Sequence, residues 1–480
     1  MTDATGDGST AVVTAFLRSR GEVLLMRRSN AVGTYSGQWG GVSGFAEGDP
    51  DEQVRVEIRE ETGLEVGEEV SFVRSGEPVR FEDPDVGRTW AVHPYLFDCA
   101  EREIELSDEH DAFEWVLPTV MLTLDIDIDI EREDAVDGRK TVPELWTAYE
   151  RVAPTVTSIA ADEEHGAAVL SIRALAVLRD RAGLLIAERG RTASSSSPRN
   201  GVNEKRMVPD TSTRAFDTDP EGEWDELADL ARQLLDARPS MAVLRNRVNR
   251  TMTEARDTSD VGSATAGAPA VLESTLSNID RAFEADAAAA ANASERIDGT
   301  VMTLSRSGTV LDALREGTPS RVFVAESRPD REGIDVAEEL VTADDVDCPV
   351  VVHTDAAVAH VLSREDVDRV VVGADTVASD GSVVNKTGTR SMALAADRDG
   401  VPVTVVTATD KISTREAVTL ASGDRSAVYD GDSPLDVLNP IFDVTPPDRI
   451  DEIVTERGSL EPTDVTDIAT EFRTFKHWND

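Results

Sequence analysis

Two apolar runs near the amino end of the chain predict a β-hairpin. The runs AVVTAFL and EVLLMRR flank Arg18-Ser19-Arg20-Gly21, where the glycine suits a tight turn. After a glycine-rich stretch over 37–48, a helical pattern covers 50–62 and stops at Gly63. Strand-like runs around 93 and 115 and a helical segment near 143–151 follow. We therefore expect a first domain over 1–150, with a mixed sheet and helices.

The middle of the chain has a different pattern. Residues 160–187 predict one or two apolar helices, and helical signals return from 224 to 294. Between them, about 188–222, turn-forming polar residues dominate and predict a flexible low-complexity insertion. We expect a helical subdomain over 151–299.

Short β-branched runs alternate with helical segments over 300–480, which predicts a Rossmann-like, doubly wound parallel sheet. The fold class is therefore α/β. Ligands bind such sheets outside the carboxyl ends of the strands. We expect the polar residues at or just after the predicted strand ends to share one edge: Ser305, Glu326, Asp355, Asp375 and Asp410.

Charge narrows the choice of partners. The 480 residues include 93 Asp+Glu against 48 Lys+Arg, giving a formal net charge of -45. A mainly electrostatic grip on DNA or RNA is disfavoured by this charge, so we expect no direct nucleic-acid partner. Only five of the cations are lysines, and the excess of carboxylates is typical of a halophilic protein in a high-salt cytoplasm.

The cysteine content and the apolar segments indicate in which cellular compartment we expect the protein. Cys99 and Cys348 are the only cysteines, too few and too far apart for a disulfide framework. The residues at the amino end lack the basic and apolar regions of a signal peptide, and no run of about 18 apolar residues occurs. We expect a cytoplasmic protein that does not enter a membrane.

Three glutamates form the first candidate for chemistry. Glu57, Glu60 and Glu61 stand at i, i+3 and i+4, so a helix projects their carboxylates from one face. Carboxylate oxygens are the ligands that hard cations such as Mg²⁺ or Mn²⁺ prefer. By spacing alone, a solvated helix face is the commoner explanation. Glu109, next to His110, is interpreted as part of an ordinary acidic turn.

The surroundings of these glutamates resemble the Nudix hydrolase family. The segment from Val56 to Leu64, VEIREETGL, is similar to the end of the Nudix box, with Val56 at the position of the box arginine. The resemblance covers about 8–150 and implies an α/β/α sandwich. It also implies that Glu57, Glu60 and Glu61 bind Mg²⁺ or Mn²⁺ and catalyse hydrolysis of a nucleoside diphosphate-linked compound. Glu47 is a further candidate loop ligand.

A second candidate site lies on the predicted parallel sheet. Asp375 ends a strand, Asn385 and Lys386 offer hydrogen-bond donors, and Gly388-Thr389 opens a helix whose free N–H groups favour an anion. A phosphorylated sugar or nucleotide suits this set of groups.

The same motifs resemble the family that unites the α, β and δ subunits of translation initiation factor 2B with aldose-ketose isomerases acting on ribose 1,5-bisphosphate or methylthioribose 1-phosphate. The segments ESRP from Glu326 and LNPIFDVTPP from Leu438 extend the resemblance over about 155–475. It implies that Asp375 is catalytic in the isomerases. It also implies that a group of residues binds substrate: Arg238, Ser305, Arg328, Asn385, Lys386, Gly388 and Thr389.

The identity of residue 305 bears on which of the implied activities we expect. The isomerases have a cysteine at this position, and a serine hydroxyl needs a partnering base to exchange protons at neutral pH. The sequence shows no such base next to Ser305. The leading hypothesis is therefore a Nudix-type pyrophosphohydrolase fused to a phosphosugar- or nucleotide-binding module. An isomerase and a non-catalytic regulatory subunit remain alternatives, and the resemblance also implies a homo-oligomer and an initiation factor as a partner.

Overall fold

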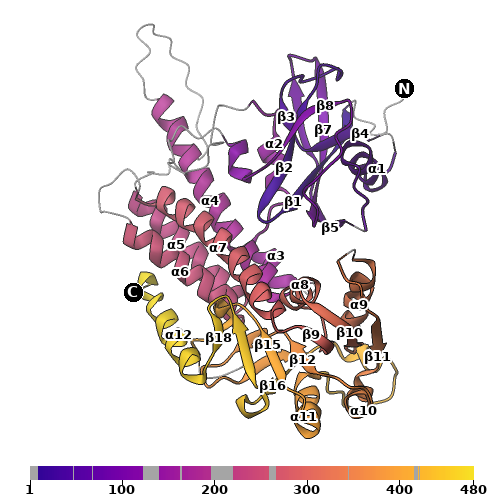
Figure 1. Cartoon of the computed structure of the whole chain (residues 1–480). Coiled ribbons are helices and arrows are strands. Elements are labelled where there is room, and N and C mark those ends of the chain that lie inside the picture. Colours follow the sequence, from indigo (N-terminus) through magenta and orange to yellow (C-terminus); the bar gives the residue numbers. More distant parts are fainter. Residues whose placement is uncertain are drawn as a thin grey trace. The chain divides into compact units, whose positions relative to one another are not determined.

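A computed structural model of the chain is shown in Figure 1. The structure describes residues 9–46, 48–67, 69–122, 140–162, 165–195, 220–258, 266–343, 345–415, 420 and 422–479. The chain divides into two compact units. The first comprises 1–158, 176–230 and 258–275, and the second comprises 159–175, 231–257 and 276–480. Each unit is described by itself.

The first unit contains a mixed sheet with the main order β3-β2-β1-β7-β5. Strands β1 and β7 are parallel, whereas β2 and β4 run antiparallel to β1, β6 runs antiparallel to β7, and β8 runs antiparallel to β2. The expected hairpin is confirmed as β1 and β2. The strands are β1 Thr10–Ser19, β2 Glu22–Arg28, β3 Trp39–Gly40, β4 Val42–Phe45, β5 Val70–Ser75, β6 Val79–Asp83, β7 Arg88–Cys99 and β8 His110–Val116.

Helices cover both faces of this sheet. Helix α1 (Pro50–Thr62) buries Val54 and Ile58 in one core, and α2 (Leu145–Glu150) buries Tyr149 in the other. The local sequence sets the ends of α1, because the Asp49 side chain caps its first turn and Gly63 adopts a left-handed conformation after its last. The α/β/α sandwich is confirmed. A short 3-10 helix, η1 (Pro118–Met121), precedes residues 123–139, which lie outside the described part.

Long helices occupy the middle of the chain: α3 Val156–Ala161, α4 Ala167–Ser195, α5 Pro220–Ala237, α6 Ala242–Thr258 and α7 Ala268–Ser294. Helix α4 runs past the expected end at 187, so 188–195 are helical and not part of a loop. Glu188, Arg189, Arg191 and Ala193 favour a helix, and no proline interrupts this segment before Pro198, which is consistent with this extension. The rest of the expected insertion, 196–219, lies outside the described residues. Both units share these helices, so the division at 150 and 299 stays a prediction.

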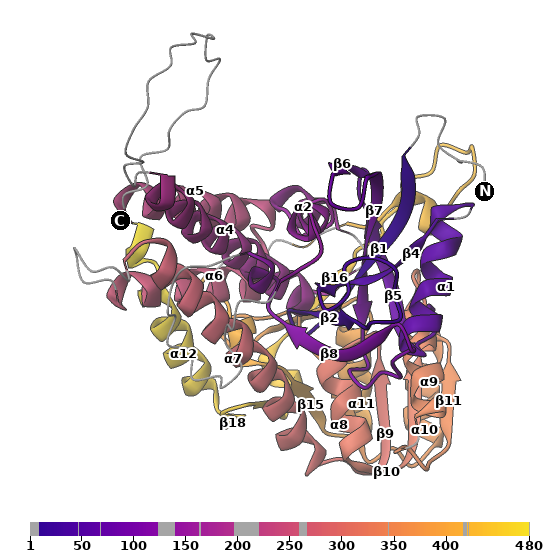
Figure 2. The ribbon, with the colours of Figure 1, turned by 90° about the horizontal axis from the view of Figure 1, so that it is seen from above.

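The second unit contains the expected doubly wound sheet, in the order β11-β10-β9-β12-β15-β17-β18. Its strands are parallel except for β18, which runs antiparallel to β17. Figure 2 shows α9, α10 and β11 grouped at one end of this sheet. The strands are β9 Asp298–Leu304, β10 Thr318–Ala325, β11 Val350–His353, β12 Arg369–Val372, β15 Val403–Val406, β17 Glu452–Thr455 and β18 Gly458–Leu460.

Apolar cores lie on both faces of the parallel sheet. One contains side chains of α10 (Val358–Arg364), α11 (Thr389–Asp399) and α12 (Pro462–Thr474). The other contains side chains of α8 (Gly308–Glu316), α9 (Glu332–Thr342) and the end of α7. The sequence pattern did not predict a small antiparallel sheet formed by β13 (Thr376–Val377), β14 (Val383–Lys386) and β16 (Phe442–Thr445). This sheet carries Asn385 and Lys386.

Across the described stretches, no helix combines the length and the apolarity that a membrane crossing requires.

Candidate functional sites

Helix α1 brings two glutamates together against β4. Glu61 is 3% exposed and accepts a hydrogen bond from the Ser43 N–H at 3.1 Å. Glu57 is half-buried and accepts one from Gln53 Nε2 at 2.6 Å. A Cβ atom at Gly44 would lie 2.0 Å from the Glu57 carboxylate. Glycine is therefore required on β4 for the helix to hold Glu57 at this position.

Burial and neighbouring carboxylates raise the pKa values of Glu57 and Glu61. Burial raises the pKa of Glu57, and the charges of Glu60 and Glu109 add to the effect. Burial also raises the pKa of Glu61 well above its usual range, and Glu57 and Glu109 raise it further. Nearby Arg28 offsets only part of the shift at Glu61. A bound cation would relieve both the burial cost and the repulsion.

The predicted metal ligands are thus only partly gathered. Glu57 and Glu61 are neighbours, while Glu60 is exposed on the same helix. Within the described stretches, no three Asp, Glu, His or Cys side chains form a ready-made metal-binding group. The charge of Glu109 raises the pKa values of both Glu57 and Glu61. The interpretation of Glu109 as an ordinary turn residue missed this proximity. Glu47 lies outside the described residues. The oxygen donors present fit a hard divalent cation.

In the second unit, three strand ends are joined by hydrogen bonds. Asp355 accepts from the backbone N–H groups of Ser327 and Arg328 at 2.8 and 2.7 Å. The Ser327 hydroxyl accepts from the Ser305 N–H at 2.7 Å. The parallel topology places the carboxyl ends of these strands at one edge, as expected. The exposed Arg328 guanidinium pairs with Glu326 at 3.3 Å.

Ser305 has a carboxylate partner after all. Its hydroxyl donates to Glu332 at 2.6 Å, and Lys386 Nζ contacts the other oxygen of Glu332 at 3.1 Å and Asp330 at 3.0 Å. The expectation of no base beside Ser305 was therefore wrong. Glu332 lies 27 residues away, in the first turn of α9, and reaches Ser305 only through the tertiary fold.

Asp375 lies beside these groups, and no cationic side chain in the described ranges is hydrogen-bonded to its carboxylate. Its side chain is partly accessible but surrounded by protein, and burial raises its pKa. The charges of Lys411 and Lys386 offset this shift only in part. Lys411 Nζ donates instead to the carbonyl of Ala374 at 2.6 Å. Asp375 is therefore a carboxyl group that a ligand can reach and that holds a proton more readily than usual.

The start of α11 differs from the expected anion site. The N–H groups of Gly388 and Arg390 donate to the Asp443 carboxylate at 2.8 and 3.1 Å. This side chain occupies the helix end that the sequence assigned to a ligand. Asn385 Nδ2 donates a hydrogen bond to the Thr389 hydroxyl at 3.0 Å, and this hydroxyl donates to the Lys386 carbonyl at 2.7 Å. These two residues fix the loop that presents Lys386.

Arg238 has structural partners in this unit. Its Nε donates to the carbonyl of Ile159 at 2.9 Å, and a second nitrogen donates to the carbonyl of Asp162. The predicted contact of Arg238 with substrate remains a prediction.

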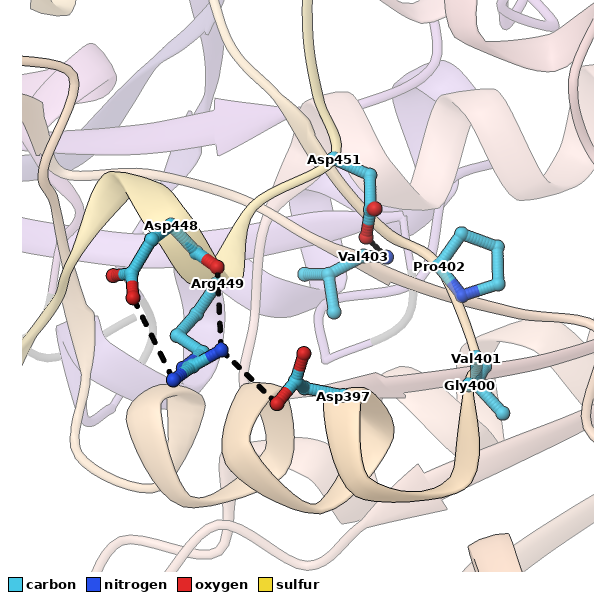
Figure 3. A pocket seen from close by; sticks show the side chains of 8 residues that line it. All are labelled: Asp397, Gly400, Val401, Pro402, Val403, Asp448, Arg449 and Asp451. Carbon is cyan, nitrogen blue, oxygen red and sulfur yellow. Dashed lines mark hydrogen bonds and ion pairs between the residues drawn. The ribbon is translucent and has the colours of Figure 1, made fainter.

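A small hollow lies at the opposite edge of the parallel sheet, near the amino ends of β15 and β17 (Figure 3). Arg449 there pairs with Asp397 at 3.0 Å and with Asp448 at 3.5 Å, and Asp451 accepts from the Val403 N–H at 2.7 Å. None of the predicted site residues lines it. Its charged groups are already paired, so we assign it no ligand.

Comparison with known proteins identifies relatives that match part of the chain. The chain is 33% identical to ribose 1,5-bisphosphate isomerase of Haloferax volcanii over 275 residues, which cover 54% of this chain and 82% of that protein. It is 38% identical to ribose 1,5-bisphosphate isomerase of Haloterrigena turkmenica, over 33% of this chain and 52% of that protein. It is 37% identical to methylthioribose-1-phosphate isomerase of Pseudomonas putida, over 34% and 48%. The matches thus span about half the length of the last two relatives.

Solved structures are also similar to the chain. They include translation initiation factor eIF-2B of Pyrococcus horikoshii OT3, with 24% identity, a TM-score of 0.49 and coverage of 66% of this chain and 99% of that chain. They also include 5-methylthioribose 1-phosphate isomerase of the same organism, with 20% identity, a TM-score of 0.49 and coverage of 66% and 86%.

Two family models match separate parts of the chain. The NUDIX domain matches residues 8–136, which contain α1 and its glutamates. The Initiation factor 2 subunit family matches residues 194–462, more than half of the chain. The chain therefore belongs to the Initiation factor 2 subunit family and carries a NUDIX domain at its amino end.

Proposed function

We propose that the first unit is a divalent-metal-dependent hydrolase of nucleoside diphosphate-linked compounds and that the second unit binds a phosphorylated sugar or nucleotide. One observation carries the first part of this proposal: the half-buried Glu57 and the buried Glu61 lie close together, and neither forms an ion pair within the described part of the chain. Strongly perturbed carboxylates of this kind gather at functional sites. The NUDIX domain match covers the same residues.

The chain's own groups hold the two carboxylates in place. The Ser43 N–H orients Glu61, and the Gln53 amide orients Glu57. Glu57 and Glu61 would hold Mg²⁺ or Mn²⁺, with Glu60 and Glu109 close enough to contribute negative charge. Such a metal ion supplies an activated water and neutralises charge on the phosphate. Fixed carboxylates reduce the reorganisation needed when the substrate binds.

The test is hydrolysis of dinucleotides and nucleotide sugars with Mg²⁺ or Mn²⁺, measured by product chromatography. We expect Glu57→Gln and Glu61→Gln to lower kcat/KM by more than about 100-fold, because even the outer partners of metal ligands are worth about 10- to 100-fold. Glu52→Gln is the matched control, since Glu52 is an exposed residue in the first turn of the same helix. Equal activity in Glu61→Gln and wild type would exclude this assignment.

A second candidate function is aldose–ketose isomerisation of a phosphorylated pentose. The hydrogen bond from Ser305 to Glu332 favours it, because the carboxylate supplies the base that a serine requires. Asp375, with its raised pKa, supplies a nearby acid, and Lys386 supplies a cation for the phosphorylated ligand. Relatives at 33% and 38% identity are named ribose 1,5-bisphosphate isomerases.

The isomerase test measures ketose formation from ribose 1,5-bisphosphate. We expect turnover in wild type and its loss in Asp375→Asn and Glu332→Gln, while Glu339→Gln, an exposed change on the same α9 helix, keeps it. Binding without turnover would instead favour a regulatory protein. A homo-oligomer and an initiation factor 2 partner belong to that proposal, and co-purification under native salt tests the partner.

A further inference from the structure

Four cationic side chains from separate parts of the second unit come together near the turn at Pro239. Arg245 on α6 and Arg415, which follows β15, both donate to the Pro239 carbonyl, Arg415 at 2.8 Å. Arg473 on α12 donates to the Thr414 carbonyl at 3.3 Å. Lys476 follows Arg473 by three residues, just after the end of this helix. We call these four side chains the cationic cluster.

The cluster is electrostatically unfavourable as it stands. Burial and the charge of Arg415 lower the pKa of Arg245 to about 10. Burial lowers the pKa of Lys476, and the charges of Arg245, Arg415 and Arg473 lower it further. None of the four forms an ion pair with a carboxylate in the part of the chain that the structure describes.

Neighbouring arginines on α6 show how different this arrangement is. Arg247 and Arg250 are also buried, but both pair with the carboxylate of Asp410. With 93 acidic residues available, the chain neutralises these two arginines by ion pairs. The arginine side chains of the cationic cluster have hydrogen bonds to carbonyl groups instead, although Arg245 lies on the same helix, two residues before Arg247 and five before Arg250.

A polar group with no hydrogen-bond partner among the described residues adjoins the cluster. The Thr414 side chain is 7% exposed, and its hydroxyl oxygen is buried with no hydrogen-bond partner among the described residues. Buried hydroxyl groups are nearly always hydrogen-bonded, so we infer that a bound group supplies the partner of this one. Thr414 lies between Arg415 in the chain and Arg473 at its carbonyl. Its hydroxyl can donate to the same anion that the cations attract.

We propose that Arg245, Arg415, Arg473 and Lys476, together with the Thr414 hydroxyl, form a phosphate-binding site separate from the groups around Asp375 and Lys386. A phosphate dianion matches the site, because guanidinium and ammonium groups bind its several oxygens by charge-assisted hydrogen bonds. The net charge of -45 opposes long polyanions, so the ligand is a small phosphate compound and not a nucleic acid. This site is independent of both proposed activities.

The test is calorimetric titration of the full chain with inorganic phosphate, with chloride adjusted to keep the ionic strength constant. Arg415→Gln and Lys476→Gln change exposed side chains that lie outside α6. We expect each to weaken phosphate binding about tenfold or more, the loss typical of one charged hydrogen bond. Arg364→Gln, an exposed change at the end of α10, is the matched control and should bind as wild type does.

Lys386→Gln separates this site from the pocket at Asp375. We expect this variant to retain the phosphate binding at the cationic cluster that Arg415→Gln weakens, and we expect phosphate to raise the thermal midpoint of Lys386→Gln more than that of Arg415→Gln. The proposal is overturned if Arg415→Gln and Lys476→Gln bind phosphate as tightly as wild type. It is also overturned if Arg364→Gln loses as much affinity as they do, since the effect would then be general screening.

Discussion

Asp375 and Asp410 follow neighbouring parallel strands, β12 and β15, yet their surroundings differ. Asp410 is 2% exposed and pairs with Arg247 at 2.8 Å and Arg250 at 2.5 Å. Burial opposes its charge, but the two arginines hold its pKa below the usual range. Asp375 is partly accessible, and burial raises its pKa despite two nearby lysines. The Asp410 carboxylate therefore connects the segment after β15 to helix α6, whereas the Asp375 carboxylate is available to a ligand.

The first unit repeats the contrast. Asp98 pairs with Arg18 at 2.7 Å, which is an ordinary structural ion pair. Glu57 and Glu61 lie close together with no such partner among the residues that the structure describes, and burial raises both of their pKa values. Carboxylates left without a cation in a protected place are candidates for function. This comparison points to two of the three residues that the Nudix resemblance implies, Glu57 and Glu61.

The largest effect is expected at the paired aspartate. Asp410→Asn removes the carboxylate that the buried Arg247 and Arg250 share and leaves Arg247 the longer contact with Asp286 at 3.6 Å. Breaking a buried pair of this kind costs about 3–5 kcal/mol. Urea unfolding measures the change. The exposed control Asp399→Asn should stay within about 0.5 kcal/mol of wild type. Similar small changes in both variants would mean that the buried pair does not stabilise the fold.

A smaller effect is expected when Lys386, the lysine beside Asp375, is replaced and ligand affinity is measured. Lys386→Gln removes the cation beside Asp375 and should weaken binding of ribose 1,5-bisphosphate about 10- to 100-fold, as expected for a charged hydrogen bond. Calorimetry on Lys386→Gln and on the exposed control Arg398→Gln measures this difference. Unchanged affinity in Lys386→Gln would remove this residue from the site.

The smallest effect concerns pH and Asp375 itself. A raised pKa in the folded state means that ionisation of Asp375 destabilises the fold, and this penalty is absent below the unfolded pKa of about 3.9. Asp375→Asn should therefore gain stability relative to wild type as pH rises through the folded pKa. Thermal unfolding between mildly acidic and neutral pH measures the difference. A constant difference, or one that falls with pH, contradicts the assignment.

Short-range patterns were sufficient to predict much of the architecture. The β1–β2 hairpin, the ends of α1 and the alternation of strands and helices after Gly299 depend on residues close in sequence. The strand-end rule also placed Ser305 and Asp375 at one edge of the sheet, because parallel strands share their carboxyl edge.

Contacts between distant segments escaped that reasoning. Glu332 reaches Ser305 across 27 residues, and Asp443 occupies the start of α11 from a strand 55 residues away. The cationic cluster joins α6, the segment after β15 and the end of α12. The hydrophobic pattern of the sequence does not predict such contacts, because they depend on how the packed elements bring distant side chains together.

The most direct measurement of the central claim is calorimetric titration of the full chain with Mn²⁺. If carboxylates without a cationic partner mark the functional site, wild type and Glu52→Gln should bind Mn²⁺ with equal affinity, whereas Glu61→Gln should bind it more than about 100-fold more weakly. Equal Mn²⁺ affinity in all three proteins would contradict the account.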